Sequence, residues 1–341
     1  MAADQDRVAQ ARAMLAQLGV TVDDLRRDAR PAAPTVGEYL ERVAAAAGPG
    51  ACRTYGSYWD RMRAAWGDRR LDEIAASDIE ALQRSTVAEA RVRRTSRGGR
   101  HAGEHVIAAA RALYNRAIAD GLIQPGDSPA HRVTKPRRLP STRRALTPDE
   151  LTQINLAARA SGNDVVLDAL LLRLHTETAC RRGGALGLRL MDLDAERGLL
   201  CLREKGGTQR WQPVTLDLAA VLADHARCRG AVLSGDALLR FRHGTAMTSR
   251  RYDHLWKRLG QELPWVAAQG ISTHWLRHTT LTWVERHFGY GVARAYAGHT
   301  DSVGAATTTY IKADLQAVAV ALSAMTGRPH PLSDWSAQWT E

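Results

Sequence analysis

Residues 274–278 read His274-Trp275-Leu276-Arg277-His278, at the start of a segment whose apolar residues recur with helical spacing. His274 and Arg277 are three residues apart, so a helix would carry both on one face, while Leu276 falls on the buried side. A short pattern of this kind also occurs in helices that have no catalytic role. Its meaning therefore depends on what accompanies it along the chain.

Three other polar patches accompany it in a definite order. Upstream, Thr178-Ala179-Cys180-Arg181-Arg182 ends an apolar segment that is predicted to be a helix from Val165, and Glu204-Lys205-Gly206-Gly207-Thr208 is predicted to form the tip of a β-hairpin. Downstream, Ala297-Gly298-His299 precedes Tyr310 by a short stretch. The combination is far more specific than any one patch.

The order and spacing of these patches resemble the tyrosine recombinase, or phage integrase, family. The T-G-x-R motif of the family corresponds to Thr178-Ala179-Cys180-Arg181, its hairpin lysine to Lys205, and its H-x-L-R motif to His274-Trp275-Leu276-Arg277. Its L-G-H motif corresponds to Ala297-Gly298-His299, and its T-x-x-Y segment ends here at Tyr310. The resemblance implies six catalytic residues: Arg181, Lys205, His274, Arg277, His299 and Tyr310.

The chemistry of the family explains these residue types. Tyr310 would attack a DNA phosphodiester and form a 3′-phosphotyrosyl link, while Arg181 and Arg277 would bind the non-bridging oxygens as negative charge develops on them. Lys205 would act as general acid for the departing 5′-oxygen, and the two histidines would hydrogen-bond the phosphate. The resemblance implies no metal ion and no nucleotide cofactor. Lysine is rare in this chain, at four of 47 basic residues, which favours a specific role for Lys205.

Two positions depart from the family pattern. The family usually has an acidic residue three positions after the first arginine, and this chain has Gly184 there. The gap from His299 to Tyr310 is about two residues longer than the common form, and the loop 301–306 is expected to absorb the difference. Neither departure removes a catalytic group, although a contact that supports Arg181 would have to come from elsewhere.

The charge of the chain points to a polyanionic partner. Its formal net charge is +11 over 341 residues, which favours nucleic acid, although many basic proteins merely carry solvated charge. Two basic segments are predicted to follow the phosphate backbone of double-stranded DNA, a Gly-rich loop and a Pro-rich linker. Their residues are Arg93, Arg94, Arg97 and Arg100 in the loop, and Lys135, Arg137, Arg138, Arg143 and Arg144 in the linker. The alternative for the loop is a solvated surface segment.

The pattern predicts a mainly α-helical protein with one small β-hairpin, and the resemblance implies a two-domain clamp around DNA. We expect a helical arm over 1–34, a helical core DNA-binding domain of the SAM-like kind over 35–122 and a basic linker over 123–145. The catalytic domain is expected over 146–326 and a C-terminal tail over 327–341.

Local signals place several element boundaries. Helices are predicted to start at Thr35, Ser77 and Thr147, each followed three residues later by glutamate, and further helices are predicted over 53–66 and 103–120. Hairpin strands are predicted over 199–203 and 210–216, the second at an edge because Pro213 cannot donate to a ladder. A helical apolar stripe after Tyr310, from Leu315 to Met325, would dock either on its own domain or, as in the family, on a neighbouring subunit. The stretch from Arg328 onward is expected to be poorly structured.

The sequence also bounds compartment and partners. No stretch reaches 18 apolar residues, no signal peptide is evident, and none of the four cysteines forms a CxxC pair, so a cytoplasmic, nucleoid-associated protein without structural zinc is expected. The resemblance implies a homo-tetramer on DNA, a monomer or dimer in free solution, and room for an accessory directionality factor. Two alternatives stay open, a type IB topoisomerase and a DNA-binding regulator without catalysis, the latter favoured only by Gly184.

Overall fold

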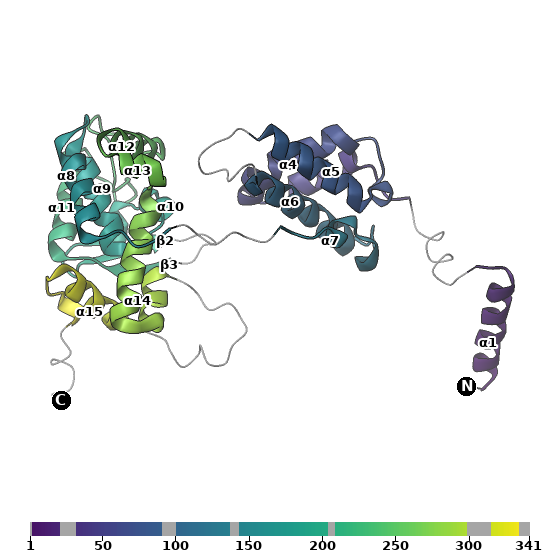
Figure 1. Cartoon of the computed structure of the whole chain (residues 1–341). Coiled ribbons are helices and arrows are strands. Elements are labelled where there is room, and N and C mark those ends of the chain that lie inside the picture. The colour runs from purple at the N-terminus through teal and green to yellow at the C-terminus, as the bar shows by residue number, and fades with distance from the viewer. Residues whose placement is uncertain are drawn as a thin grey trace. The chain divides into compact units, whose positions relative to one another are not determined.

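The computed structural model describes residues 2–20, 32–90, 100–136, 143–203, 209–298 and 315–333. The chain divides into two compact units, Met1–Leu139 and Pro140–Glu341, which are drawn together in Figure 1. Each unit has a hydrophobic core of its own. Among the described residues, no helix is both long and apolar enough to span a lipid bilayer.

The first unit is helical throughout its described residues. Its elements are α1 (Ala2–Gln17), α3 (Val36–Ala46), α4 (Pro49–Trp66), η1 (Leu71–Glu73), α5 (Ala76–Glu89), α6 (Arg100–Ala119), η2 (Pro125–Asp127) and α7 (Pro129–Arg132). Tyr39, Met62, Ile107 and Tyr114 are almost completely buried between α3, α4 and α6. Their burial supplies the apolar area that stabilises this small bundle.

Helix starts in this unit test the capping predictions. Thr35 caps α3 as predicted, with its hydroxyl accepting from the Glu38 amide at 3.3 Å. The start predicted at Ser77 is wrong, because α5 already begins at Ala76. There the carboxylate of Asp78 accepts from the Ala75 amide at 2.9 Å. Asp78 therefore supplies the N-terminal acceptor that the pattern had assigned to Ser77.

The second unit combines helices with a small sheet. Its elements are α8 (Pro148–Ala160), α9 (Val165–Thr178), α10 (Arg182–Leu186), η3 (Leu190–Asp192), β1 (Leu193–Asp194), β2 (Leu199–Arg203), β3 (Gln209–Pro213), α11 (Leu216–Cys228), α12 (Arg250–Glu262), α13 (Pro264–Gln269), α14 (Thr273–Ala297), α15 (Leu315–Thr326) and η5 (Pro331–Ser333). The capping box predicted at Thr147 is present at the start of α8. A mainly helical fold with one small sheet is thus confirmed.

The sheet has three antiparallel strands in the order β1-β2-β3. Leu200 of β2 pairs with Leu193 of β1 and with Gln212 of β3. Strand β1 was not predicted, whereas the edge position of the strand that carries Pro213 is confirmed. The strand ends at Pro213 because α11 follows at once, capped by Thr215, whose hydroxyl accepts from the Leu218 amide.

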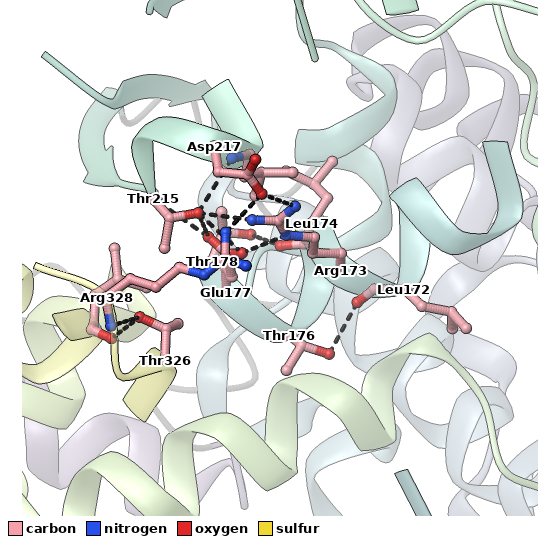
Figure 2. A network of polar contacts seen from close by, with 12 residues as sticks. Leu172, Arg173, Leu174, Thr176, Glu177, Thr178, Thr215, Asp217, Thr326 and Arg328 are labelled. Atoms are coloured by element: carbon pink, nitrogen blue, oxygen red, sulfur yellow. Dashed lines mark hydrogen bonds and ion pairs between the residues drawn. The ribbon is translucent and has the colours of Figure 1, made fainter. Parts of the chain in front are cut away.

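The C-terminal segment packs on its own unit. The apolar stripe of α15, including Val318 and Leu322, is buried against Val284 and Tyr296 of α14. Beyond it, Arg328 forms an ion pair with Asp217 of α11, as Figure 2 shows. His330 is buried and lies 3.0 Å from the Gly198 carbonyl oxygen. The expectation of poor structure is therefore wrong for residues 328–333, and residues from 334 lie outside the described part.

Candidate active site

The first predicted catalytic arginine, Arg181, follows the C-terminal end of α9. Helix α9 ends at Thr178, and Ala179 then adopts the left-handed conformation with φ 49° and ψ 21°. Among the described residues it is the one non-glycine residue with a positive φ. The reversal sends the chain through buried Cys180 to Arg181, which stands at the N-cap position of α10. Backbone strain of this kind concentrates at functional sites.

The N-terminal half of α14 carries two more of the six predicted catalytic residues. His274 and Arg277 lie in its first turns, and Arg277 is buried with 4% of its surface exposed. Its guanidinium donates to the Ala179 carbonyl oxygen and, at 2.7 Å, to the Ala297 carbonyl oxygen. Arg277 therefore ties the reversal after α9 to the end of α14.

These residues line one cleft. The cleft has a volume of about 550 Å³, and Arg181, His274 and Arg277 are all part of its wall. Its other lining residues are Cys180, Arg182, Gly183, Tyr252, Asp253, Trp256, Ser272 and Thr273. Residues from α10, α12 and α14 thus meet in a cleft that holds several fixed positive charges.

Burial and the positive charge around the cleft lower the pKa of His274. Burial lowers the pKa of His274, and the neighbouring charges of Arg143, Arg277, His278 and Arg181 lower it further. The imidazole is therefore neutral near pH 7, with one nitrogen able to donate and one able to accept. A neutral imidazole between two arginines can take part in both phosphate binding and proton transfer.

The segment before α8 is fixed beside this cleft. Arg144 pairs with Glu150 through two short contacts of 2.5 and 2.6 Å, and this pairing holds the pKa of Glu150 down at about 2. The Leu146 amide donates to the Thr279 hydroxyl of α14 at 2.9 Å. Of the predicted DNA-contacting residues, Lys135, Arg143 and Arg144 are exposed. Arg93, Arg94, Arg97, Arg137 and Arg138 lie outside the described residues, as does the side chain of Arg100.

Three predicted catalytic residues also lie outside the described part: Lys205, His299 and Tyr310. The elements that flank them are described. Strand β2 ends at Arg203 and β3 begins at Gln209, while α14 ends at Ala297 and Gly298 takes a left-handed φ of 64°. The Arg210 guanidinium of β3 lies directly against Gly298, so that a β-carbon there would collide with it. The hairpin stem and the end of α14 are therefore neighbours.

The unusual glycine at position 184 is buried in α10. A β-carbon there would meet the Arg203 carbonyl oxygen at 3.6 Å, which is an ordinary contact. A buried carboxylate is found instead just before the reversal, at Glu177 (Figure 2). It accepts from Arg173 Nε at 2.7 Å and from the Thr215 amide at 3.0 Å, and its backbone carbonyl accepts from the Tyr296 hydroxyl. Glu177 thus anchors the end of α9 to α11 and to α14.

Sequence reasoning missed the contribution of α12. Tyr252, Asp253 and Trp256 line the cleft, and the Trp256 indole donates to the Thr273 hydroxyl at 2.8 Å. No motif marks these residues. The helical spacing of Tyr252 and Trp256 predicts only an apolar face, and Asp253 reads as an ordinary exposed carboxylate.

A comparison with known families shows the family to which this chain belongs. The model described as "Phage integrase family" matches residues 144–316, which is half of the chain. The chain belongs to the phage integrase family. The match begins at Arg144 and spans every described residue of the cleft, as well as positions 205, 299 and 310.

Curated relatives of this phage integrase family member are tyrosine recombinases. Tyrosine recombinase XerD of Mycobacterium leprae (strain TN) is 31% identical over 188 residues, which cover 51% of this chain and 58% of that protein. XerD of Mycobacterium tuberculosis (strain CDC 1551 / Oshkosh) is 30% identical over 243 residues, which cover 63% of this chain and 73% of that protein. The sequence therefore places this chain among the tyrosine recombinases.

Solved integrase structures share its fold. A lambda integrase tetramer bound to a Holliday junction matches with a TM-score of 0.60 at 18% identity, covering 88% of this chain and 89% of that one. The Tn1549 transposon integrase in complex with a circular intermediate DNA matches with a TM-score of 0.57 at 16% identity, covering 82% and 95%. Homologous integrases bind DNA as dimers or tetramers.

Proposed function

We propose that this tyrosine recombinase cleaves and rejoins DNA at specific sites through a covalent link between Tyr310 and a 3′-phosphate. The observation that carries the proposal is the cleft in which Arg181, His274 and Arg277 meet. Two fixed guanidinium groups and a neutral imidazole suit a phosphodiester, which gains charge on its non-bridging oxygens as a fifth oxygen approaches phosphorus. The tyrosine is then expelled by the 5′-hydroxyl of another strand, so no phosphodiester is lost overall.

The remaining roles rest on the motif correspondence in the sequence, and the family match over residues 144–316 includes these positions. Lys205 would protonate the departing 5′-oxygen, and His299 would hydrogen-bond the phosphate together with His274. The neighbouring positions of the hairpin stem and the end of α14 support this assignment, because the segments that carry these residues leave the described fold close together. The basic linker residues Arg143 and Arg144 would follow the backbone of the duplex beside the cleft.

We further propose that the working assembly is a homo-tetramer on double-stranded DNA. Strand exchange between two duplexes needs four cleaved strands and therefore four nucleophiles. The dimeric and tetrameric integrase complexes of the same fold support this assembly.

Covalent trapping tests the proposed reaction. The probe is a duplex recovered by repeated binding of the full-length chain from a random-sequence pool, nicked near each candidate scissile phosphate and analysed on a denaturing gel. The wild-type chain should give a slowly migrating DNA–protein adduct, and Tyr310→Phe should bind the same duplex without forming it. An adduct that persists in Tyr310→Phe, or none in the wild type on bound DNA, would refute the proposal.

The general-acid role has its own test. Lys205→Ala should slow cleavage, and a 5′-bridging phosphorothioate should restore the rate, because a thiolate leaves without a proton. Arg181→Ala and Arg277→Ala should lose roughly a hundred- to a thousand-fold in rate and gain nothing from the sulfur. Equal slowing of Lys205→Ala on both substrates would contradict the assignment.

A further inference from the structure

A buried histidine of α9 contacts a buried tyrosine of α12 that lines the candidate active site. His175 sits in the last turn of α9 with 1% of its surface exposed. Its Nδ1 lies 3.1 Å from the Cys180 carbonyl oxygen, and its Nε2 lies 2.8 Å from the Tyr252 hydroxyl of α12. The two rings meet edge to face at 5.3 Å. Neither side chain has a part in the proposed chemistry.

The contacts fix one tautomer of His175. A carbonyl oxygen can only accept, so Nδ1 carries the proton and donates to the Cys180 carbonyl oxygen, with Cys180 Sγ at 3.4 Å from the same nitrogen as a second, weaker acceptor. Nε2 is then an acceptor, and the Tyr252 hydroxyl donates to it. Burial lowers the pKa of His175 to about 4 and raises the pKa of Tyr252, so both groups keep these forms at neutral pH. The result is a directed chain of hydrogen bonds from α12 through α9 to Cys180.

This chain ends at the backbone that carries Arg181. The Cys180 carbonyl belongs to the peptide bond that leads into Arg181, and the preceding carbonyl, of Ala179, is held by Arg277. Both carbonyl groups before the catalytic arginine are therefore fixed, one from α14 and one from His175. The same helix α12 also holds Thr273, the residue before His274, through Trp256. Helix α12 thus hydrogen-bonds to His175, which contacts the backbone before Arg181, and to Thr273 beside His274.

We propose that His175 and Tyr252 are positioning residues for DNA cleavage, which hold the Cys180 carbonyl and so aim the guanidinium of Arg181 at the scissile phosphate. The inference rests on the proposed function. Removing the Tyr252 hydroxyl leaves Nε2 without its donor and removes the contact that holds the far side of the ring, so the imidazole can turn away from the Cys180 oxygen. A misplacement of the order of 1 Å costs roughly a hundred-fold in rate, so Tyr252→Phe should cleave ten- to a hundred-fold more slowly.

A substrate with an uncharged scissile group distinguishes a variant that misplaces Arg181 from a variant that disturbs the fold in general. A methylphosphonate at the scissile position replaces one non-bridging oxygen by methyl, so the transition state carries less negative charge and needs Arg181 less. The rate defect of Arg181→Ala should therefore shrink on this substrate. If His175 and Tyr252 act through Arg181, the defects of Tyr252→Phe and His175→Leu should shrink with it.

The experiment measures single-turnover adduct formation by the full-length chain on the selected nicked duplex, with phosphate or methylphosphonate at the mapped scissile position. His175→Asn should retain more activity than His175→Leu, because an asparagine amide can still donate to the Cys180 oxygen. Two matched controls remove buried hydrogen bonds elsewhere. Tyr114→Phe loses a bond to the Leu71 carbonyl in the first unit, and His225→Leu loses one from the Arg240 amide.

The outcomes are distinct. The inference is supported if Tyr252→Phe and His175→Leu cleave slowly at unchanged DNA affinity and this defect shrinks on methylphosphonate. Both controls should cleave at the wild-type rate. Wild-type cleavage rates in both variants would overturn the inference. So would a rate defect in these variants that is as large on methylphosphonate as on phosphate, while the defect of Arg181→Ala shrinks. Either result leaves the proposed function intact. No adduct with the wild-type chain would refute the proposed function and this inference together.

Discussion

Asp168 of α9 holds a buried triad of charges whose disruption should be costly. Asp168 is fully buried and accepts from Arg251 Nε at 2.7 Å and from Arg258 Nη2 at 2.5 Å. Arg251, which is itself 6% exposed, also donates to the Asn163 side chain and to the Asp164 carbonyl oxygen. The triad joins α9, which ends just before Arg181, to α12, which lines the cleft.

Asp168→Asn would leave the buried Arg251 guanidinium and the partly buried Arg258 guanidinium without the carboxylate that both contact. Removing one partner of a buried ion pair costs about 3–5 kcal/mol, because the remaining charge stays desolvated. The change should be measured as the free energy of unfolding in urea, followed by tryptophan fluorescence, since Trp256 lies on the same helix as both arginines. A loss of this size corresponds to a shift of roughly a hundred- to several-thousand-fold in the folding equilibrium.

Two comparisons make the measurement decisive. Asp224→Asn removes an ion pair with Arg227 whose side chains are 65% and 73% exposed, and it should cost no more than about 1 kcal/mol. Replacing Asp168, Arg251 and Arg258 together by apolar residues of similar volume should recover most of the loss, because desolvation then disappears with the charges. If Asp168→Asn costs as little as Asp224→Asn, the reasoning about this triad is wrong.

Three further predictions concern pH, capping and the backbone. Burial lowers the pKa of His175 and of His225 to about 4 from 6.5, so the unfolded chain binds these protons first. Stability is retained above pH 6.5 and is lost as the pH falls towards 4, by up to roughly 3 kcal/mol for each histidine, and urea unfolding of His225→Gln should show a flatter pH profile. Thr147→Ala should cost about 1 kcal/mol by removing the cap of α8, measured by the same unfolding assay; no loss would mean that the capping box does not stabilise the helix. Gly298→Ala should reduce adduct formation more than stability, because alanine at φ 64° costs roughly 1–2 kcal/mol and its β-carbon would displace Arg210 beside the entrance to the segment of His299; unchanged adduct yield would contradict this.

Much of the local structure could be predicted because its causes lie within a few residues. The capping boxes at Thr35 and Thr147 are present, and the edge position of the strand with Pro213 follows from the missing amide of proline. The error at Ser77 is equally local. The carboxylate that accepts from the N-cap amide is Asp78 and not Glu80, so the N-cap is Ala75, two residues before Ser77. Local rules therefore place elements well and their first residues less well.

The candidate site could be predicted only in part. The motifs named Arg181, His274 and Arg277, and the fold brings all three to one cleft. The sequence did not indicate that the conformation of Ala179 and its contact with Arg277 would join two of these motifs, because a left-handed alanine has no local signature. Nor did it indicate that Arg143 would act on the pKa of His274.

The family and the helical class follow from the sequence alone, and the six catalytic groups are predicted from it, because motif order, helical period and turn residues are properties of the chain. The fold was needed to show that α12 lines the cleft, that His175 meets Tyr252, and that α15 packs on its own unit. Each of these contacts joins segments far apart along the chain. Such contacts form because apolar faces must be buried and buried polar groups must find partners, and the partner that a group finds depends on the whole fold.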